Sequence, residues 1–544
     1  MHRCLHIEEV IRNVAASLRT DDMESHRDTL PTLASMAVTC HSFKEVALDQ
    51  LWYKLYESIL PLVMLFPKDS WEFRRLYNGE QEFHFTRVLH ANDWTRFTYY
   101  AKKIRNIEHI DETYSSSRSI SSISTSAFLA LSLHRPTPIL LPNLIKLRWC
   151  DARVDSLPFI HLFLTRQLVT LRLMPTGTMV IWDDRAKQLI AALPIDCPKL
   201  RKLVVTNWPC RQFSSALLPP VQAQRLSHNA SLKDITLRDQ PISRETLIYL
   251  AALPQLESAC FAYVDHHVLD LDTSLGQIQI FPSLQTLDLI VLHISPLFEL
   301  LHSLSPFKLL TSISLSIERG FSPSNIQKLF AAIGQLSSLQ TLCVCISGKR
   351  LRSSFEDLSA WGPLGRLTLS QITPVFSLRN LRILSIRTPS FILDDPLLDA
   401  VARNMPNLVS IDLGSNSEPL FQPTQVTLQG LLPLARHCLS LELLSVPIDT
   451  SITTSSPSNG ADIISTLLTR LHVRDSSAAQ PARIAEFLAK HFTALSCISR
   501  DSGRSGSDGQ QDQIRRRQWR EVNREFVKII PRDWDDEDSY VDTD

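Results

Sequence analysis

Glycine is scarce in this sequence of 544 residues and its cysteines are scattered, and both features exclude functions. With only 14 glycines, the chain has no GxxxxGK[ST] or GxGxxG phosphate-binding pattern and no GxSxG nucleophile pattern. The 10 cysteines form no CxxC pair and keep no recurring spacing, so the sequence predicts neither a zinc site nor a disulfide framework. We therefore expect no enzymatic activity, no catalytic residues, no metal and no cofactor.

Excess charge and long apolar runs are also lacking. The 56 basic and 56 acidic side chains cancel, so no global field favours nucleic acid or a membrane surface. Glu8 and Glu9 stand where a secretory signal would have its apolar core, and no apolar run approaches the roughly 20 residues of a membrane span. We expect a cytoplasmic and/or nuclear protein with reduced thiols that binds neither nucleic acid nor membrane.

A short phrase recurs along the chain: a leucine, two variable residues, an aliphatic residue, one variable residue and another aliphatic one. Its first leucines fall at 144, 168, 200, 232, 256, 284, 310, 339, 364, 381, 408, 441 and 468, and most steps are 24 to 33 residues, with one short step of 17. This pattern resembles the leucine-rich repeat, whose strand-helix units stack because no unit buries its own apolar face. An armadillo-like helical stack is the alternative, disfavoured by valine, isoleucine and threonine at period two.

The N-terminal stretch reads as three short helices. A first helix around "IEEVIRNVAASL" is followed by two across "LPTLASMAVTCHSFKEVALDQLW", where apolar residues keep a three-four rhythm. About 45 residues are too few to bury this apolar face internally, so part of it should receive a partner.

These residues are similar to the F-box, the module through which substrate receptors dock onto the Skp-family adaptor of cullin ubiquitin ligases. The ending "TCHSFKEVALDQLW" is the most specific part of the match, whereas the Leu-Pro with which the family usually opens is replaced here by Leu5 and His6. An F-box followed by leucine-rich repeats resembles the F-box/leucine-rich-repeat receptors, and the stretch "NDWTRFTYYAKKIRNI" resembles the connector of fungal members.

The resemblance implies a substrate receptor of an SCF-type ligase that does no chemistry itself. The adaptor-binding residues, shared between the module's core and the adaptor groove, would be Leu5, Ile7, Val10, Ile11, Leu33, Met36, Cys40, Phe43, Leu51 and Trp52. The alternative is that these residues only form the core of a helical cap on the repeats.

Residues between the aliphatic positions of each phrase should project from the open face of the sheet, where repeat proteins commonly bind. On the first strands these positions are basic, and we take as candidate client-binding residues Lys146, Arg148, Arg172 and Lys202. Later strands are nearly neutral. The hypothesis is that this basic patch favours an acidic or phosphorylated client segment, and the alternative is an ordinary solvated face.

The expected fold is therefore α/β, with a three-helix F-box ahead of a leucine-rich-repeat horseshoe solenoid. We predict an F-box over 1–55, a helical connector over 56–135, the solenoid over 136–475, a capping helix over 476–500 and a disordered tail over 501–544. A repeat scaffold that binds partners without delivering ubiquitin is the alternative function. The expected partners are a Skp-family adaptor with its cullin complex and a protein client.

Overall fold

The structure is a computed structural model, and it describes residues 7–18, 23–56, 58–77, 79–111, 122–151, 154–174, 184–206, 224, 230–238, 242, 244–264, 281–294, 297–304, 309–319, 323–346, 367–388, 391–414, 423–451, 467–474, 476–500 and 509–530. The chain divides into two compact units, Met1–Ala262 and Tyr263–Asp544. We describe each by itself and call them the first and second units.

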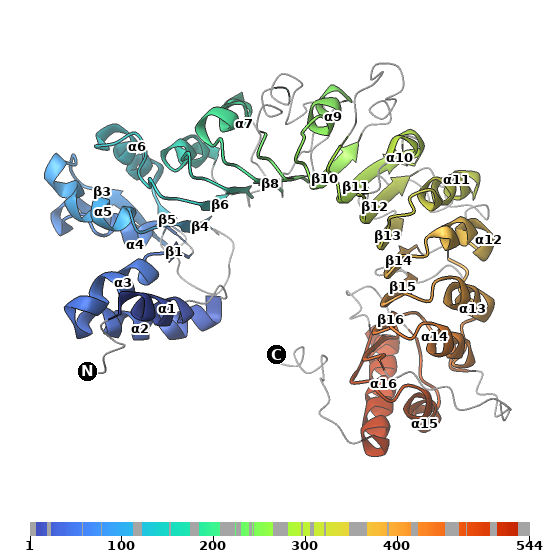
Figure 1. The fold of residues 1–544 in the computed structure, drawn as a ribbon. Helices are drawn as coiled ribbons and strands as arrows, with labels where there is room; N and C mark the ends of the chain where they lie inside the picture. Colours follow the sequence, from blue (N-terminus) through green and yellow to red (C-terminus); the bar gives the residue numbers. More distant parts are fainter. Residues whose placement is uncertain are drawn as a thin grey trace. The chain divides into compact units, whose positions relative to one another are not determined.

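The first unit begins with three helices, which we call the N-terminal module. They are α1 (Glu8–Ser17), α2 (Met23–Thr39) and α3 (His41–Leu51), and α3 packs against both α1 and α2 (Figure 1). Four side chains form the buried core of the module, namely Ile11, Ala15, Leu33 and Val46. The expected three helices are therefore present, and their core is small.

A mixed region follows, where the sequence predicted a helical connector. It contains short helices, α4 (Leu60–Val63), η2 (Lys68–Ser70), η3 (Ala91–Asp93), α5 (Trp94–Ala101) and α6 (Thr125–His134), together with a sheet of β2 (Trp71–Arg75), β3 (Gln81–Phe85) and β5 (Ser122–Ile123). The prediction of a helical connector is wrong for β2, β3 and β5, because alternate aromatic residues on β2 and β3 pack as a sheet. Phe83 is fully buried there, with its ring centroid 5.4 Å from that of Trp71.

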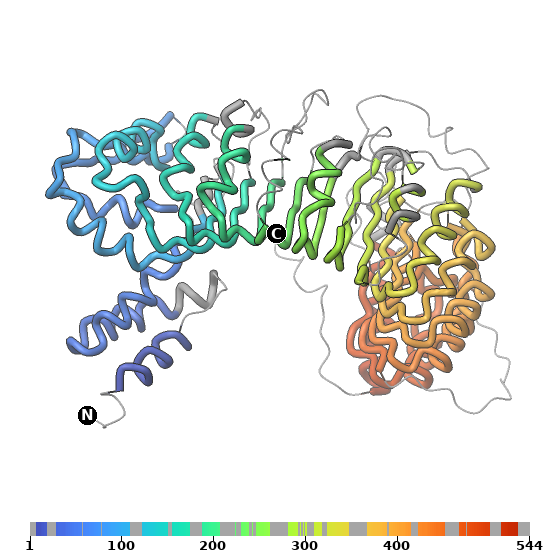
Figure 2. The backbone as a smooth tube through the Cα atoms, turned by 45° about the horizontal axis from the view of Figure 1, so that its top comes forward, coloured from blue at the N-terminus to red at the C-terminus, as the bar shows by residue number. Residues whose placement is uncertain are grey.

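Parallel strands with helices on one side make up the rest of the first unit. In spatial order the strands are β1 (Lys54–Leu55), β4 (Asn106–Asp111), β6 (Lys146–Asp151), β7 (Thr170–Leu173), β8 (Lys202–Val205), β9 (Asp234–Leu237) and β10 (Ser258–Val264). The helical segments between them are η4 (Val154–Leu162), α7 (Asp184–Asp196) and α9 (Arg244–Ala251). Figure 2 shows the strands of this unit side by side, with the helices on one face.

The second unit repeats this plan. Its parallel strands are β11 (Thr286–His293), β12 (Ser312–Arg319), β13 (Thr341–Ile346), β14 (Ile383–Arg387), β15 (Ser410–Gly414), β16 (Leu443–Ser445), β17 (Arg470–His472) and β18 (Cys497–Ser499). The helices are α10 (Leu297–Leu304), α11 (Pro323–Gly334), α12 (Leu369–Ile372), η7 (Thr373–Ser377), α13 (Asp395–Asn404), η8 (Gln429–Leu431), α14 (Leu432–His437), α15 (Pro481–His491) and α16 (Gly509–Ile529). Both units therefore have the strand-helix architecture of a leucine-rich-repeat-like fold.

The recurring phrase places these strands. In twelve of its copies the strand begins two residues after the first leucine, and each of those leucines is at most 2% exposed. Within the strands buried and partly exposed residues alternate, as on β13, because successive side chains point to opposite faces. The leucine therefore anchors each repeat under the sheet, and the alternate residues form what we call the strand face.

The phrase at 364 is the exception, and it explains the short step of 17. Most of it lies outside the described residues, but Leu367 forms only an isolated bridge to Phe391 and is followed at once by α12. Strand β13 pairs directly with β14, whose phrase begins at Leu381. This copy therefore contributes no strand to the repeats.

Three strands lie beyond the expected limits of the solenoid, 136–475. Strands β1 and β4 lie before residue 136, and β18 lies after residue 475. Only two residues separate β1 from the end of α3. The sequence signal for β4 and β18 is present in weaker form, since Ile104 and Leu495 occupy the place of the phrase leucine and are buried. The repeats therefore start directly at the N-terminal module.

The C-terminal region also differs from expectation. The prediction of a disordered tail over 501–544 is wrong for α16, a helix of 21 residues that packs on α15. Residues 501–508 and 531–544 lie outside the described residues. Trp519, Val522 and Phe526 are at most 3% exposed, because their spacing of three and four brings them to one helix face. The predicted cap over 476–500 contains α15 and β18, and α16 covers α15. Of the helices in these described ranges, none has the length and apolar character that a bilayer crossing demands.

Candidate functional site

The predicted adaptor-binding residues divide between the interior and the surface of the N-terminal module. Leu5 lies outside the described residues. Ile11 and Leu33 are 3% and 0% exposed and belong to the module's own core. Ile7 is 51% exposed at the start of α1. The remaining predicted residues are partly buried, and they are Val10, Met36, Cys40, Phe43, Leu51 and Trp52.

Two exposed apolar side chains of the module were missed by the sequence reasoning. Val38 near the end of α2 is 85% exposed, and Val14 on α1 is 48% exposed. Val14 lies seven residues after Ile7, which is two helical turns, so the two share one side of α1. The helical rhythm of the sequence could have indicated Val14, whereas the exposure of Val38 depends on how α2 packs against α3.

A tight joint connects the module to the first repeats. The Trp52 ring lies 4.5 Å, centroid to centroid, from Tyr100 on α5, and the Tyr53 carbonyl accepts hydrogen bonds from the backbone amides of Arg105 and Asn106. Trp52 also precedes β1 by two residues, which is the place of the phrase leucine in the first repeat. Its side chain therefore packs between module and repeats.

Charged groups reinforce this joint. The Tyr99 hydroxyl donates to Glu45 at 2.6 Å, and the Lys103 ammonium donates to Glu45 at 2.9 Å and to Asp49 at 2.6 Å. Hydrogen bonds from Lys103 and Tyr99 lower the pKa of Glu45. Since α3 contributes both carboxylates, while Tyr99 lies on α5 and Lys103 in the turn directly after it, the polar contacts hold α3 against the C-terminal end of α5.

The four predicted client-binding residues lie on the strand face of the first unit, on three neighbouring strands. Arg148 on β6 stands beside Arg172 on β7, while Lys146 and Lys202 flank Thr170 in the next row. Two of the charges are compensated: Lys202 pairs with Asp234 on β9, and Arg148 lies 4.0 Å from Glu108 on β4. The structure therefore gathers the predicted basic patch, with part of its charge balanced by neighbouring strands.

Lys146 and Arg172 are exposed, and neither forms an ion pair within the described part of the chain. The Arg148 side chain is 34% exposed, and its Nε is buried with no hydrogen-bond partner among the described residues. An anionic group reaching this face would find two adjacent guanidinium groups, which match carboxylates and phosphates well.

The strand face of the second unit is organised around a largely buried carboxylate, Asp412 on β15. Its Oδ2 accepts hydrogen bonds from Arg387 Nε at 2.7 Å and from Ser385 Oγ at 3.1 Å, and its Oδ1 accepts from Arg474. We call Ser385, Arg387, Asp412 and Arg474 the Asp412 network. Burial raises the pKa of Asp412, but Arg474 and Arg387 outweigh it and hold the pKa below its ordinary value.

Nucleophilic side chains occur on the same face of the second unit. Ser445 Oγ lies 3.2 Å from His472 Nδ1, and Ser445 also hydrogen-bonds Asp412. Here the serine stands between acid and histidine, whereas a serine nucleophile needs the histidine between serine and acid. Cys343 and Cys345 share one side of β13, and burial raises the pKa of the Cys343 thiol, which disfavours its reactive thiolate. The described ranges hold no group of three or more potential metal ligands.

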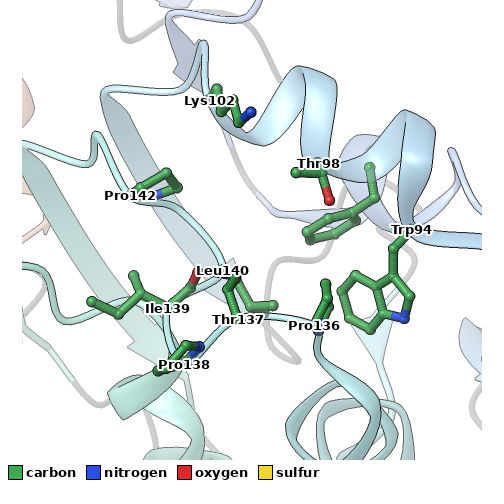
Figure 3. Close-up of a pocket in the computed structure, with 10 residues that line it drawn as sticks. Trp94, Thr98, Lys102, Pro136, Thr137, Pro138, Ile139, Leu140 and Pro142 are labelled. Carbon is green, nitrogen blue, oxygen red and sulfur yellow. Dashed lines mark hydrogen bonds between the residues drawn. The ribbon is translucent and has the colours of Figure 1, made fainter. Parts of the chain in front are cut away.

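A pocket of about 230 Å³ lies in the first unit between α5 and the loop that leads into β6. Figure 3 shows Lys102 near one end, Trp94 and Pro136 at the other, and Pro138 and Ile139 across from α5. Its remaining lining residues are Phe97, Thr98, Thr137, Leu140 and Pro142. The sequence reasoning missed this pocket, because its walls come from segments about 40 residues apart.

Comparison with known proteins gives little further information. No protein-family model and no curated protein matches the sequence. Among solved structures, the chain is similar to a plant peptide hormone receptor, RGFR1 in complex with RGF2, at 11% identity, over 74% of this chain and 67% of the receptor, with a TM-score of 0.27. The repeat architecture therefore rests on the strands and helices of this chain itself, and it is typical of proteins that bind other proteins.

Proposed function

We propose that this protein is the substrate receptor of an SCF-type cullin ubiquitin ligase. In this proposal the N-terminal module docks a Skp-family adaptor, the repeats hold a client protein, and the receptor itself performs no chemistry. The observation that carries it is a separate three-helix module with F-box-like sequence whose core cluster has only four buried side chains and whose surface exposes apolar residues.

The adaptor contact would use the apolar side chains that the module leaves in solvent. Ile7, Val14 and Val38 are between 48% and 85% exposed, and removing such surface from water stabilises a complex by roughly 25 cal/mol per Å². Half-buried Met36 and Phe43 pack on the core and would widen this surface. Helices that dock in a groove typically share their apolar residues between core and partner in this way.

The joint beneath the module supports a receptor role. A receptor must hold its client at a defined position relative to the ligase, so the module should not swing freely on a linker. The Trp52–Tyr100 contact and the bonds from Lys103 to Glu45 and Asp49 fix α3 on the first repeats.

The client would bind the strand face of the first unit. Lys146, Arg148, Arg172 and Lys202 present positive charge there, and Arg148 and Arg172 stand side by side on neighbouring strands. An acidic or phosphorylated segment is the matching chemistry.

The first experiment is co-purification of the full chain with a recombinant Skp-family adaptor. The informative variant is Val38→Glu, because Val38 is 85% exposed and its replacement does not disturb the core. The matched control is Val88→Glu, which adds the same charge at a 56% exposed valine outside the module. We expect wild type and Val88→Glu to bind, and binding of Val38→Glu to fall at least about tenfold, since a carboxylate buried in an interface is costly.

Failure of the wild-type chain to bind any Skp-family adaptor would overturn the proposal, and the module would then be a cap on the repeats. If the adaptor binds but no cullin joins the complex, the alternative function, a scaffold that does not deliver ubiquitin, is correct. The substitution Trp52→Ala is a poor test, since it also breaks the joint to Tyr100.

A further inference from the structure

The pocket between α5 and the loop of residues 136–142 has a different chemistry from the strand face. Its walls are mainly aromatic and aliphatic carbon, with three prolines, Pro136, Pro138 and Pro142. No acidic side chain lines it. It lies beside the helix that carries the joint to the N-terminal module, because α5 contributes Thr98 to the pocket and Tyr99 to the joint.

The walls of the pocket are held rigidly from behind. Phe66 packs edge-on against Trp94 and in a stacked arrangement against Phe97, with ring centroids 5.0 and 5.1 Å apart. On the other side Asn143 donates to the carbonyl of Lys102 at 2.8 Å, which ties the proline loop to the end of α5. Fixed prolines and packed rings lose little entropy when a ligand binds, so the pocket is preorganised.

The two ends of the pocket differ in character. At one end Trp94 and Pro136 offer apolar surface (Figure 3). At the other end stands Lys102, which is exposed and forms no ion pair within the described ranges. The Arg105 guanidinium donates to the Lys102 carbonyl at 2.6 Å, so a second cation lies close by.

We propose that this pocket binds an acidic peptide segment of a partner protein, with one bulky apolar side chain in the pocket and a neighbouring carboxylate on Lys102. The volume of about 230 Å³ is below the roughly 300–1,000 Å³ of sites for drug-sized molecules and suits a single large side chain. The cationic end with no acidic lining residue selects for negative charge beside that anchor.

The helix next to the pocket loop in the chain favours a peptide as the occupant. Helix α6 leads into the pocket loop and exposes two leucines one turn apart, Leu129 at 49% and Leu133 at 68%. A peptide longer than its anchor residue could cover such apolar surface, which a small molecule confined to the pocket would leave in water. The inference does not depend on ligase function, since a scaffold could use the same pocket.

The test is selection from a displayed library of random twelve-residue peptides on the full-length protein. We expect a consensus with Leu, Met, Phe or Trp next to Asp or Glu. A synthetic consensus peptide is then measured by fluorescence polarisation against four variants. Thr98→Phe fills the pocket and Lys102→Glu reverses its charge. Thr95→Phe and Arg96→Glu are the matched controls, since both sites are exposed positions of α5 outside the pocket lining.

We expect binding to weaken at least about tenfold in Thr98→Phe and about fivefold in Lys102→Glu, and less than about twofold in both controls. Lys102 is on the surface, so its variant reports on binding even if Thr98→Phe folds poorly. The proposal is overturned if no peptide is enriched, if the consensus lacks the apolar anchor or the acid, or if Lys102→Glu binds as the wild type does.

Discussion

The strand faces of the two units have the same backbone plan but use their charges differently. In the first unit Arg172 is exposed and Arg148 keeps a third of its side chain in solvent. In the second unit the side chains of Arg474 and Asp412 are 3% and 14% exposed and bond to each other. A parallel repeat can therefore hold an arginine at its strand face either as an exposed surface charge or, just beyond a strand, as a buried partner of a carboxylate.

The difference is one of desolvation. A solvent-exposed guanidinium group has no desolvation penalty and is available to a partner. A buried guanidinium group is stable only if an opposite charge lies nearby. Asp412 supplies that match for Arg474 and at the same time binds Arg387. We therefore propose that the first face binds a partner and that the Asp412 network stabilises the fold.

The largest effect should follow from Asp412→Ala. The buried Arg474 guanidinium would lose its carboxylate, and breaking a buried ion pair on one side typically costs about 3–5 kcal/mol of unfolding free energy. Urea unfolding followed by circular dichroism measures the loss. The control is Asp399→Ala, which removes an exposed partner of Arg403 on α13 and should cost at most about 0.5 kcal/mol. Equal losses in the two variants would contradict a structural role for the network.

A smaller, pH-dependent effect should come from the same carboxylate. Because Arg474 and Arg387 hold the pKa of Asp412 below its ordinary value of 3.8, the stabilising effect of the carboxylate is fully present above that pH. It is lost as the pH falls through the lower folded-state pKa. The expected measurement is a stability difference between wild type and Asp412→Asn that is constant from pH 7 to pH 5 and shrinks below pH 4. A difference that grows on acidification would refute the sign of this shift.

Gly414→Ala should have an intermediate effect. Gly414 ends β15 with a φ of +123°, and an added Cβ would lie 3.2 Å from Pro447 Cδ and 3.3 Å from Arg474 Cδ. We expect a loss of about 1–3 kcal/mol in thermal or urea unfolding, from backbone strain together with displacement of Arg474. Gly79→Ala in the first unit has a φ of +88° but no neighbour within 4 Å, so it reports backbone strain alone. If both variants lose the same stability, Gly414 is not required for the position of Arg474.

The sequence predicted the repeated strands well, because the phrase leucine is a local signal. A leucine three residues before another aliphatic residue indicates where a strand begins and which of its residues are buried. Twelve phrases form a strand in this way. The prediction of a strand from the phrase at 364 was wrong, because the same residue pattern there precedes the short helix α12. Only the direct pairing of β13 with β14 distinguishes this phrase from those that form strands. Helix α16 was not predicted because the polar composition of the tail was given more weight than the helical spacing of Trp519, Val522 and Phe526.

The candidate sites were predicted less completely, since they depend on contacts between distant segments. Alternation along β6 and β7 was enough to place Arg148 and Arg172 on one face. Nothing in the sequence near Asp412 indicates that Arg474, 62 residues later, bonds to it. The pocket beside α5 likewise needs the proline loop to fold back onto Lys102. Contacts between distant segments leave no periodic pattern in the sequence, so sequence analysis does not detect them.

The smallest effect on stability should follow from Arg172→Ser. Arg172 is exposed and forms no ion pair within the described residues, so unfolding free energy should change by no more than about 0.5 kcal/mol. Binding should respond where stability does not. We expect the affinity of a capped hexaglutamate peptide, measured by calorimetry at low salt, to fall about fivefold in Arg148→Ser/Arg172→Ser and to stay unchanged in Arg403→Ser, an exposed arginine of the second unit. Unchanged affinity in the double variant would mean that the first strand face is an ordinary solvated surface, and its contrast with the Asp412 network would then concern stability alone.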